Sequence, residues 1–234
     1  MIRGIVFDFD GVLADSEMLH LRAYQEILAA SNIELTKEHY WDRYLGLDDA
    51  GVFAQVAADN GLLFGDEELD LLIHEKGRRF EALISQEDVL FPGVAEVVRR
   101  LQAEWPLGIA SGSLRREIEV MLAAGGLSDA FAFIVSTEDT ERSKPAPDPY
   151  LLAVERHGLP AAACVAIEDS QQGLQSARAA GLRTIGVAGT YDRAVLAPLA
   201  DVVVDSIEEI TVEFVQQIAV NSATSQIPIS QDDR

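Results

Sequence analysis

The chain has 234 residues, of which 48% are hydrophobic, so it can bury a sizeable core either as one domain or as a core with an insert. Its 18 basic and 39 acidic residues give a formal net charge of -21, which argues against nucleic acid and anionic membranes as partners and means that a phosphate ligand needs local positive charge. The single cysteine, Cys164, excludes an internal disulfide, and no run of about 20 apolar residues is present to cross a membrane, so we expect a cytoplasmic protein.

Short apolar runs bounded by turn residues recur along the chain and predict buried, parallel strands. They lie at residues 2–7, 107–110, 131–135, 164–167, 184–187 and 202–204. Helical patterns at 94–103, 115–124, 149–157 and 171–180 alternate with them. This alternation is typical of the α/β class and predicts a doubly wound, Rossmann-like parallel sheet.

The stretch 15–86 departs from this alternation. It carries no convincing strand pattern and predicts helices at 17–30, 36–44, 52–60 and 67–84. An all-helical insert after the first strand would form a small second domain over the carboxyl edge of the sheet, where such folds bind ligands. We therefore expect an α/β core of residues 1–14 and 87–218, a helical cap of residues 15–86, and a disordered tail at 219–234.

The first strand ends in two aspartates, Asp8 and Asp10, which are followed by Gly11. Side chains alternate along a strand, so both carboxylates leave the same face. Their like charges repel unless a cation lies between them or one binds a proton, and either outcome suits chemistry on a metal-bound anion. The alternative is that both aspartates cap the next helix while Gly11 serves the turn.

Polar residues also follow the second and third strands. Ser111, Gly112 and Ser113 form a small-residue turn that opens a helix, where free N–H groups and a hydroxyl can bind a phosphoryl oxygen. The alternative for Ser111 is a plain helix cap. Lys144 precedes a proline that favours an extended backbone and so can hold the ammonium in place, although an isolated lysine is more often a solvated loop residue.

The fourth strand ends in two adjacent carboxylates, Glu168 and Asp169, which suggest a hard cation that prefers oxygen ligands. In a parallel sheet the strand ends share one edge, so these groups would meet the aspartates, the serine turn and Lys144 in one crevice. The four separate indications thereby support a single site.

The four motifs resemble those of the haloacid dehalogenase-like superfamily of phosphotransferases. They occur in order as DFDG, the serine of IASGS, the lysine of SKPAPDPY, and IEDS, and the resemblance covers about residues 1–210. The helical insert after the first motif resembles the cap of the beta-phosphoglucomutase and phosphoglycolate-phosphatase-like branch. The resemblance therefore implies the α/β core of this superfamily together with a helical cap.

The resemblance also implies a mechanism and a Mg²⁺ cofactor. Asp8 would attack phosphorus to form an aspartyl-phosphate, and Asp10 would protonate the leaving oxygen and then deprotonate water. Ser111 and Lys144 would stabilise charge on the phosphoryl oxygens, with Gly11, Gly112 and Ser113 in the phosphate-binding turns. The metal ligands implied are Asp8, the backbone carbonyl of Asp10, Asp169, and Glu168 either close by or bridged by water.

Two residues of the predicted cap fall on its inward faces. Lys76 fills a gap in the apolar stripe of the helix at 67–84, and His20 shares a face with Ala23, Tyr24 and Ile27. Each side chain either packs as part of that face or points into the crevice as a ligand-binding group. Beta-phosphoglucomutases resemble this chain at both positions, where the matching residues orient the acid/base and favour sugar transfer over water.

The chain departs from those mutases at Asp49, where they carry an arginine that binds the distal phosphate. An acid at this position would repel a second phosphate. Arg43, Arg78 or Arg79 could substitute from nearby positions.

Our leading hypothesis is a phosphoric monoester hydrolase, a Mg²⁺-dependent phosphatase of a small phosphorylated metabolite, most plausibly a sugar phosphate that the cap encloses. The alternative is a hexose-phosphate mutase similar to beta-phosphoglucomutase. A third class, a non-enzymatic phospho-receiver, also gathers acidic residues, a hydroxyl and a lysine at a sheet edge, but the helical insert and a phosphoacceptor on the first strand argue against it. The sequence carries no indication of the oligomeric state.

Overall fold

The computed structural model describes residues 1–45, 47–84 and 89–221. Its centre is a six-stranded sheet in which all paired strands run parallel. The strands lie in the order β3-β2-β1-β4-β5-β6. Their bounds are β1 Gly4–Phe7, β2 Leu107–Ala110, β3 Phe133–Val135, β4 Cys164–Glu168, β5 Arg183–Val187 and β6 Val202–Val204. The predicted doubly wound parallel sheet is confirmed.

Strand β1 lies at the point where the strand order reverses, between β2 and β4. Phe7 is in register with Ile109 on one side and with Ile167 on the other. The residues that follow these three therefore leave the sheet at the same edge. This is the switch point at which open α/β sheets bind their ligands.

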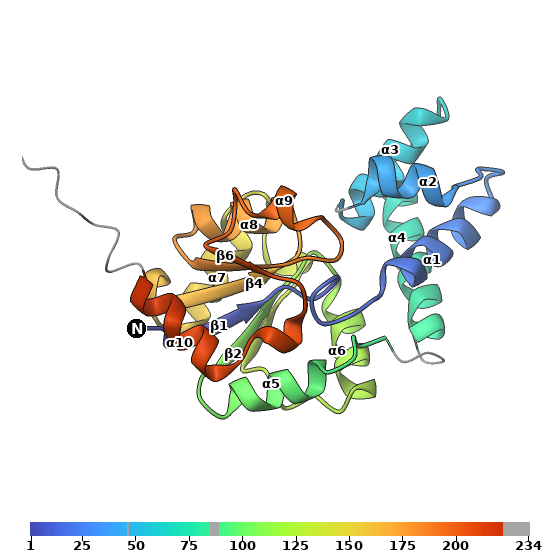
Figure 1. Ribbon diagram of the computed structural model, residues 1–234. Coiled ribbons are helices and arrows are strands. Elements are labelled where there is room, and N and C mark those ends of the chain that lie inside the picture. The colour runs from blue at the N-terminus through green and yellow to red at the C-terminus, as the bar shows by residue number, and fades with distance from the viewer. Residues whose placement is uncertain (46, 85–88, 222–234) are drawn as a thin grey trace, which may run out of the picture.

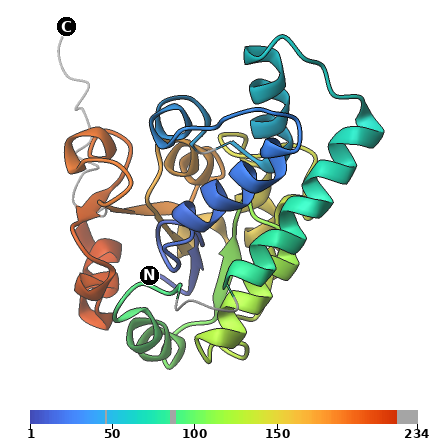
Figure 2. The ribbon, with the colours of Figure 1, turned by 90° about the vertical axis from the view of Figure 1, so that its right-hand side faces the viewer.

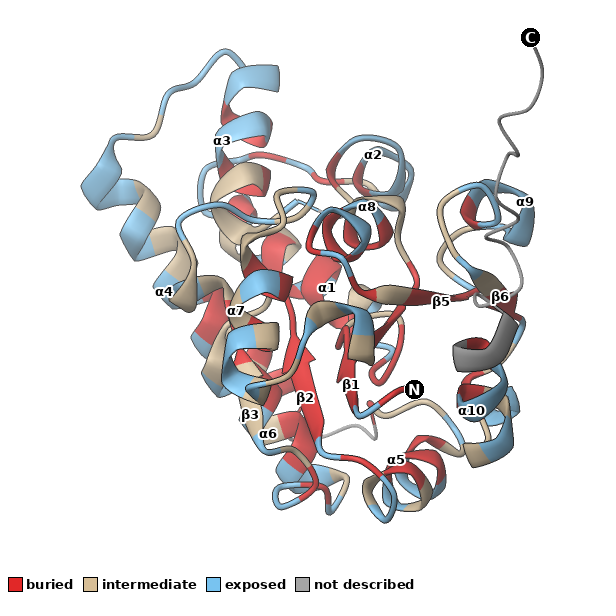
Figure 3. Cartoon of the chain, turned by 90° about the vertical axis from the view of Figure 1, so that its left-hand side faces the viewer, coloured by how far each residue is buried: buried red, intermediate tan, exposed pale blue. Residues whose placement is uncertain are grey.

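Helices cover both faces of the sheet, and the strands between them are buried (Figure 3). Ile5 and Phe7 of β1 pack against one layer, and Val6 packs against the other, as strand alternation requires. The first layer contains α5 (Val94–Gln102), α6 (Arg115–Ala124) and α10 (Val212–Asn221). The second contains α7 (Asp148–His157) and α8 (Gln171–Ala179), with the short α9 (Arg193–Leu196) beside α8.

Four helices from the segment 15–86 stand together beyond the sheet (Figures 1 and 2). They are α1 (Glu17–Ala29), α2 (Lys37–His39), α3 (Asp49–Asp59) and α4 (Asp66–Ile84). They enclose an apolar cluster of their own that includes Leu21, Tyr24 and Phe53. The last turns of α4 reach the main core through Phe80 and Ile84, so this helix connects the two apolar clusters.

Two of these helices differ from the sequence prediction. The helix expected at 36–44 is the short α2 followed by a turn of π-helix at Tyr40–Tyr44, in which the N–H of Leu45 donates to the carbonyl of Tyr40. Helix α3 starts before the expected residue 52 because the side chain of Asp48 caps it, accepting the N–H of Gly51 at 2.8 Å.

The two chain segments that link these helices to the sheet lie side by side. Asp15 donates its N–H to the carbonyl of Val89 at 2.8 Å, and Phe91 donates to the carbonyl of Leu13 at 3.0 Å. The antiparallel bridge between Ala14 and Leu90 lies at the centre of this pairing.

Within the described parts of the chain, no helix combines the length and the apolar character that a membrane span requires. Helix α10 extends to Asn221, and residues 222–234 of the predicted tail lie outside the described residues.

Candidate active site

Asp8 follows directly on β1 and contacts the lysine that the sequence singled out. Its N–H donates to the carbonyl of Ile167 at 2.8 Å, which fixes the backbone against the end of β4. Lys144 donates to Asp8 Oδ1 at 2.8 Å, to Glu168 Oε1 at 2.6 Å and to the carbonyl of Ala110 at 2.9 Å. An ammonium has three donors, and all three are used here to hold one orientation.

Three buried carboxylates meet at this edge. Oxygen atoms of Asp8, Glu168 and Asp169 all lie within 4.8 Å of one another. Burial and the charge of Glu168 raise the pKa of Asp8 to about 7, although Lys144 opposes the shift. Burial and the charges of Asp8 and Glu168 raise the pKa of Asp169 well above its usual range. Lys144 supplies less positive charge than the three acids need, so a divalent cation would relieve this repulsion.

Glu168 is held more firmly than the other two carboxylates. Its Oε1 accepts from Lys144 and from the hydroxyl of Tyr150 at 2.9 Å, and its Oε2 accepts from Ser170 Oγ at 3.0 Å. These partners occupy lone pairs that a metal would otherwise use. Asp8 and Asp169 are left with more free lone pairs for a cation than Glu168 has.

The carboxylate of Glu168 occupies the space where a side chain at Gly173 would begin. A Cβ on Gly173 would lie 1.8 Å from Glu168 Oε1. We therefore expect Gly173→Ala to displace α8 or Glu168 and to lower the free energy of unfolding by about 1–3 kcal/mol. Urea denaturation measures this change as a lower midpoint with an unchanged slope. The control is Gly65→Ala, where no atom lies within 4 Å of the new Cβ; equal midpoints for both variants would contradict the expectation.

Asp10 lies among hydroxyl donors. It accepts hydrogen bonds from Ser16 and, at 2.5 Å, from Ser113, and the Ser111 hydroxyl is 3.5 Å away. His20 Nε2 lies 3.6 Å from Asp10 Oδ1. Burial alone would raise the pKa of Asp10, but the contacts with His20 and the two serines lower it to about 2. The carboxylate is thus ionised and surrounded by donors.

The turns that the sequence predicts to bind phosphate lie at the same place. Ser111 is buried, its N–H donates to the carbonyl of Val135, and its Oγ accepts the N–H of Ser113 at 3.0 Å. Gly112 is exposed and has open space where a Cβ would be. Gly11 has a φ of 79°, which glycine adopts without strain, and its N–H donates to the carbonyl of Ala14.

His20 is both packed and turned toward Asp10. Its ring stacks on Phe80 with centroids 4.0 Å apart, and Nδ1 lies 2.8 Å from the ammonium of Lys76. Lys76 is fully buried behind His20, and Lys76 itself does not line the cavity between cap and sheet. The structure thus places Lys76 behind His20 and Asp49, two residues that line the cavity.

A cavity of about 380 Å³ lies between the strand ends and the helical insert, where α1, α3, α4 and the π-helical turn contribute lining residues, and it is in the size range of small-molecule sites. Among the described lining residues that can carry a charge, acidic side chains predominate. They are Asp8, Asp10, Glu17, Asp48, Asp49, Glu138 and Asp169, against Lys144 and His20.

The arginines that the sequence offered for a distal phosphate do not reach this cavity. Arg43 pairs with Asp59 at 2.8 Å, Arg79 pairs with Glu26, and Arg78 is exposed. None of the three is among the described lining residues, so that hypothesis is wrong. Asp49 is partly neutralised, because its Oδ1 lies 2.9 Å from the Lys76 ammonium.

Sequence reasoning missed several residues of the site. Glu17, in the first turn of α1, and Asp48 both line the cavity, and Glu17 Oε2 accepts from the hydroxyl of Tyr40 at 2.9 Å. The position of Glu17 just after the first motif is a signal that could have identified it. Tyr150 and Glu117 lie within helices like ordinary packing or surface residues, so nothing local distinguishes them.

Comparisons with known proteins find relatives that cover most of the chain. The family model of haloacid dehalogenase-like hydrolases matches residues 5–187. CbbY of Rhodobacter capsulatus is 35% identical over 82% of this chain and 88% of its own length, and the fructose-1-phosphate phosphatase YqaB of Escherichia coli is 29% identical over 79% and 95%. The crystal structure of CbbY from Rhodobacter sphaeroides with xylulose-(1,5)bisphosphate has a TM-score of 0.81 and 30% identity, covering 89% of this chain and 96% of that one.

Proposed function

The chain belongs to the haloacid dehalogenase-like hydrolase family, and we propose that within it this protein is a Mg²⁺-dependent phosphatase that acts on a small sugar monophosphate through an aspartyl-phosphate. The observation that carries the proposal is the meeting of Asp8, Asp169 and Lys144 at one end of a cavity between sheet and cap. The acidic cluster fits a divalent cation because its buried carboxylates carry more negative charge than Lys144 balances.

Asp8 and Asp169 would hold the cation, with Glu168 and the backbone carbonyl of Asp10 close to it. When bound, Mg²⁺ supplies positive charge that keeps Asp8 ionised and screens it from the anionic substrate. Asp8 then acts as the nucleophile: a carboxylate oxygen bonds to phosphorus, and the sugar oxygen leaves. Lys144 already donates to Asp8, so it lies where it can also stabilise charge on the phosphoryl oxygens.

Asp10 has the surroundings of an acid/base group. With a pKa of about 2 in this arrangement it is ionised, as deprotonation of water requires. A phosphoryl dianion beside it would raise its pKa, because a second negative charge favours the protonated form. Asp10 can then give a proton to the leaving sugar oxygen and recover it from the water that attacks the aspartyl-phosphate.

The polar lining of the cavity outside the acidic cluster favours hydroxyl groups over a second phosphate. Asp49 Oδ2 at the start of α3 and Gln172 Oε1 at the start of α8 are buried and accept no hydrogen bond from the described residues, so both have lone pairs for a substrate hydroxyl. Glu17 and Asp48 add further acceptors there. A sugar or sugar alcohol supplies the matching donors, whereas a distal phosphate would meet like charge.

The mutase alternative rests on His20 and Lys76, which match beta-phosphoglucomutases. It is less well supported, because a mutase that uses a bisphosphate must bind phosphate at both ends of its cavity. Among the described lining residues Lys144 is the one lysine or arginine, and it is already paired with Asp8 and Glu168. Family membership and the cavity between sheet and cap also favour an enzyme over a phospho-receiver.

A panel of phosphorylated metabolites tests the proposal. We would assay fructose 1-phosphate, sorbitol 6-phosphate, beta-glucose 1-phosphate, phosphoglycolate and xylulose 1,5-bisphosphate with Mg²⁺ and with chelator, measuring both free phosphate and isomerised sugar. We expect phosphate release from a sugar monophosphate that stops with chelator and returns when Mg²⁺ is restored. Conversion of beta-glucose 1-phosphate to the 6-phosphate faster than hydrolysis would support the mutase instead, and turnover unaffected by chelator would refute the metal dependence.

A further inference from the structure

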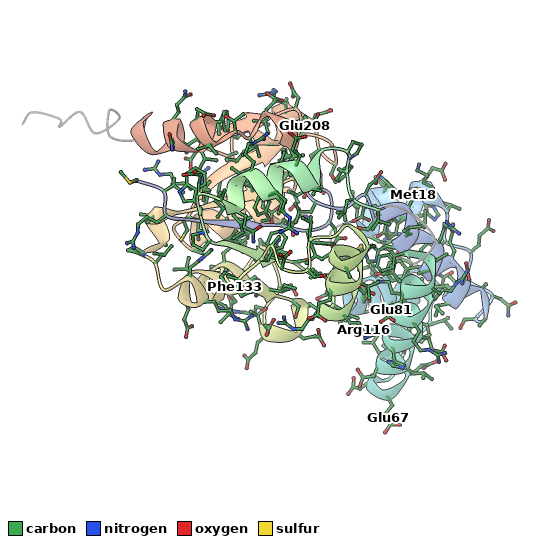
Figure 4. All side chains as sticks on the ribbon, turned by 90° about the horizontal axis from the view of Figure 1, so that it is seen from below. Met18, Glu67, Glu81, Arg116, Phe133 and Glu208 are labelled. Atoms are coloured by element: carbon green, nitrogen blue, oxygen red, sulfur yellow. The ribbon has the colours of Figure 1, made fainter. Side chains whose placement is uncertain are left out.

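A buried carboxylate of the core reaches into the helical cap. Glu117 belongs to α6 beside the sheet, yet its side chain is only 2% exposed, and Oε1 lies 3.5 Å from the ammonium of Lys76 on α4. Helix α6 packs along α4, and an exposed ion pair between Arg116 and Glu81 joins the same two helices (Figure 4). A buried charge is costly unless it is paired, and Lys76 is the partner here.

The ammonium of Lys76 has three polar neighbours, one for each of its donors. Besides Glu117 they are Asp49 Oδ1 at 2.9 Å and His20 Nδ1 at 2.8 Å. The rings of Tyr24 and Phe80 lie about 5 Å away and close the remaining sides. The two carboxylates therefore decide where the third N–H points, which is toward His20.

This contact determines which nitrogen of His20 carries the proton. A lysine ammonium only donates, so Nδ1 must accept, and the ring proton is then on Nε2. Nε2 faces Asp10 Oδ1 at 3.6 Å. A chain of contacts thus runs from Glu117 through Lys76 and His20 to the acid/base group.

Glu117 is the member of this chain that lies outside the cap. His20, Asp49 and Lys76 come from α1, α3 and α4, whereas Glu117 comes from α6 of the core. The orientation of Lys76 therefore depends on how the cap is docked on the core. We propose that Glu117 is a positioning residue of the reaction, which holds Lys76 so that His20 presents its Nε2 proton to Asp10. This inference rests on the proposed phosphatase function.

The test compares two leaving groups. A sugar alkoxide needs a proton as it departs, whereas 4-nitrophenolate is stable without one, so only the first depends on a well-placed general acid. We would measure kcat/KM of Glu117→Gln for the fastest sugar phosphate of the panel and for 4-nitrophenyl phosphate, on the same preparation. We expect a fall of about 10- to 100-fold for the sugar phosphate and less than about 3-fold for 4-nitrophenyl phosphate.

The ratio of the two kcat/KM values does not depend on how much of the protein is folded, so partial unfolding of the variant cannot imitate the effect. The controls are Glu119→Gln, an exposed glutamate on the same helix, and Glu81→Gln, which breaks the exposed pair between α4 and α6. Both should keep the wild-type ratio. In a Lys76→Met background, Glu117→Gln should change the ratio no further, because Glu117 acts through Lys76.

An unchanged ratio in Glu117→Gln, including an equal loss with both substrates, would overturn the positioning role. A further change of the ratio in the Lys76→Met background would also contradict it. Wild-type protein that hydrolyses neither substrate would instead refute the proposed function, so the two failures are distinguishable.

Discussion

Asp8→Asn should abolish phosphatase activity, with a loss of about 10⁴-fold or more in kcat, because the amide cannot bond phosphorus as the carboxylate does. The fold should survive the change. Burial and the charge of Glu168 raise the pKa of Asp8, so removing its charge relieves repulsion among the buried acids. Phosphate release and circular dichroism measure activity and folding on the same sample.

The informative control is Asp10→Asn, which we also expect to be nearly inactive in steady state but for a different reason. It keeps the nucleophile, so with 4-nitrophenyl phosphate it should release one burst of nitrophenol and then stall as the aspartyl-phosphate. Asp8→Asn should give no burst. Turnover that survives in Asp8→Asn while Asp10→Asn loses it would show that the two roles are assigned wrongly.

Lys144→Met should lower kcat/KM for the sugar phosphate by about 10²- to 10³-fold, the usual cost of removing one electrostatic partner of a transition state. Without the ammonium, Asp8 and Glu168 lose their hydrogen-bonded cation, and the acidic cluster repels a phosphate. Steady-state kinetics with the sugar phosphate and with 4-nitrophenyl phosphate should show the loss for both substrates, since phosphate binding is common to them.

The same variant should also be less stable, by about 3–5 kcal/mol without metal, because a buried charge loses its partner. Added Mg²⁺ should restore part of this loss by replacing the missing positive charge, and thermal melts with and without Mg²⁺ measure the difference. Lys37→Met, at an exposed position, is the matched control. A Lys144→Met protein that melts like wild type and binds substrate normally would contradict the role of Lys144.

The fold and the central site could be predicted because their signals are local. The apolar runs predict the strands, and Asp8, Ser111, Lys144 and Asp169 follow them in the sequence. Because parallel strands end at the same edge of a sheet, these residues are predicted to meet there. The sequence patterns do not determine the order of the strands within the sheet. It is the adjacency of β1 and β4, with Phe7 level with Ile167, that brings Asp8 to Glu168 and Asp169.

The cap was predicted less completely because its contacts are between distant segments. The helical pattern placed Lys76 on an inward face, but its partners Asp49 and Glu117 come from elements 27 and 41 residues away in the sequence. From the sequence alone Glu117 looks like an exposed charge, because it is the packing of α4 against α6 that buries it. The π-helical turn at Tyr40–Tyr44 was also not predicted, because its pattern of apolar residues does not differ from that of an α-helix continuing from α2.

The two segments that join the helical insert to the sheet, at Leu13, Ala14 and Leu90, also affect the position of Asp10. The backbone that joins them is continuous with the turn of Gly11, whose N–H bonds to Ala14, and with Asp10 just before it. A shift of these links relative to the sheet would therefore displace the backbone of Asp10 as well. The attachment of the helical insert and the position of the Asp10 carboxylate are thus set by the same short backbone segment.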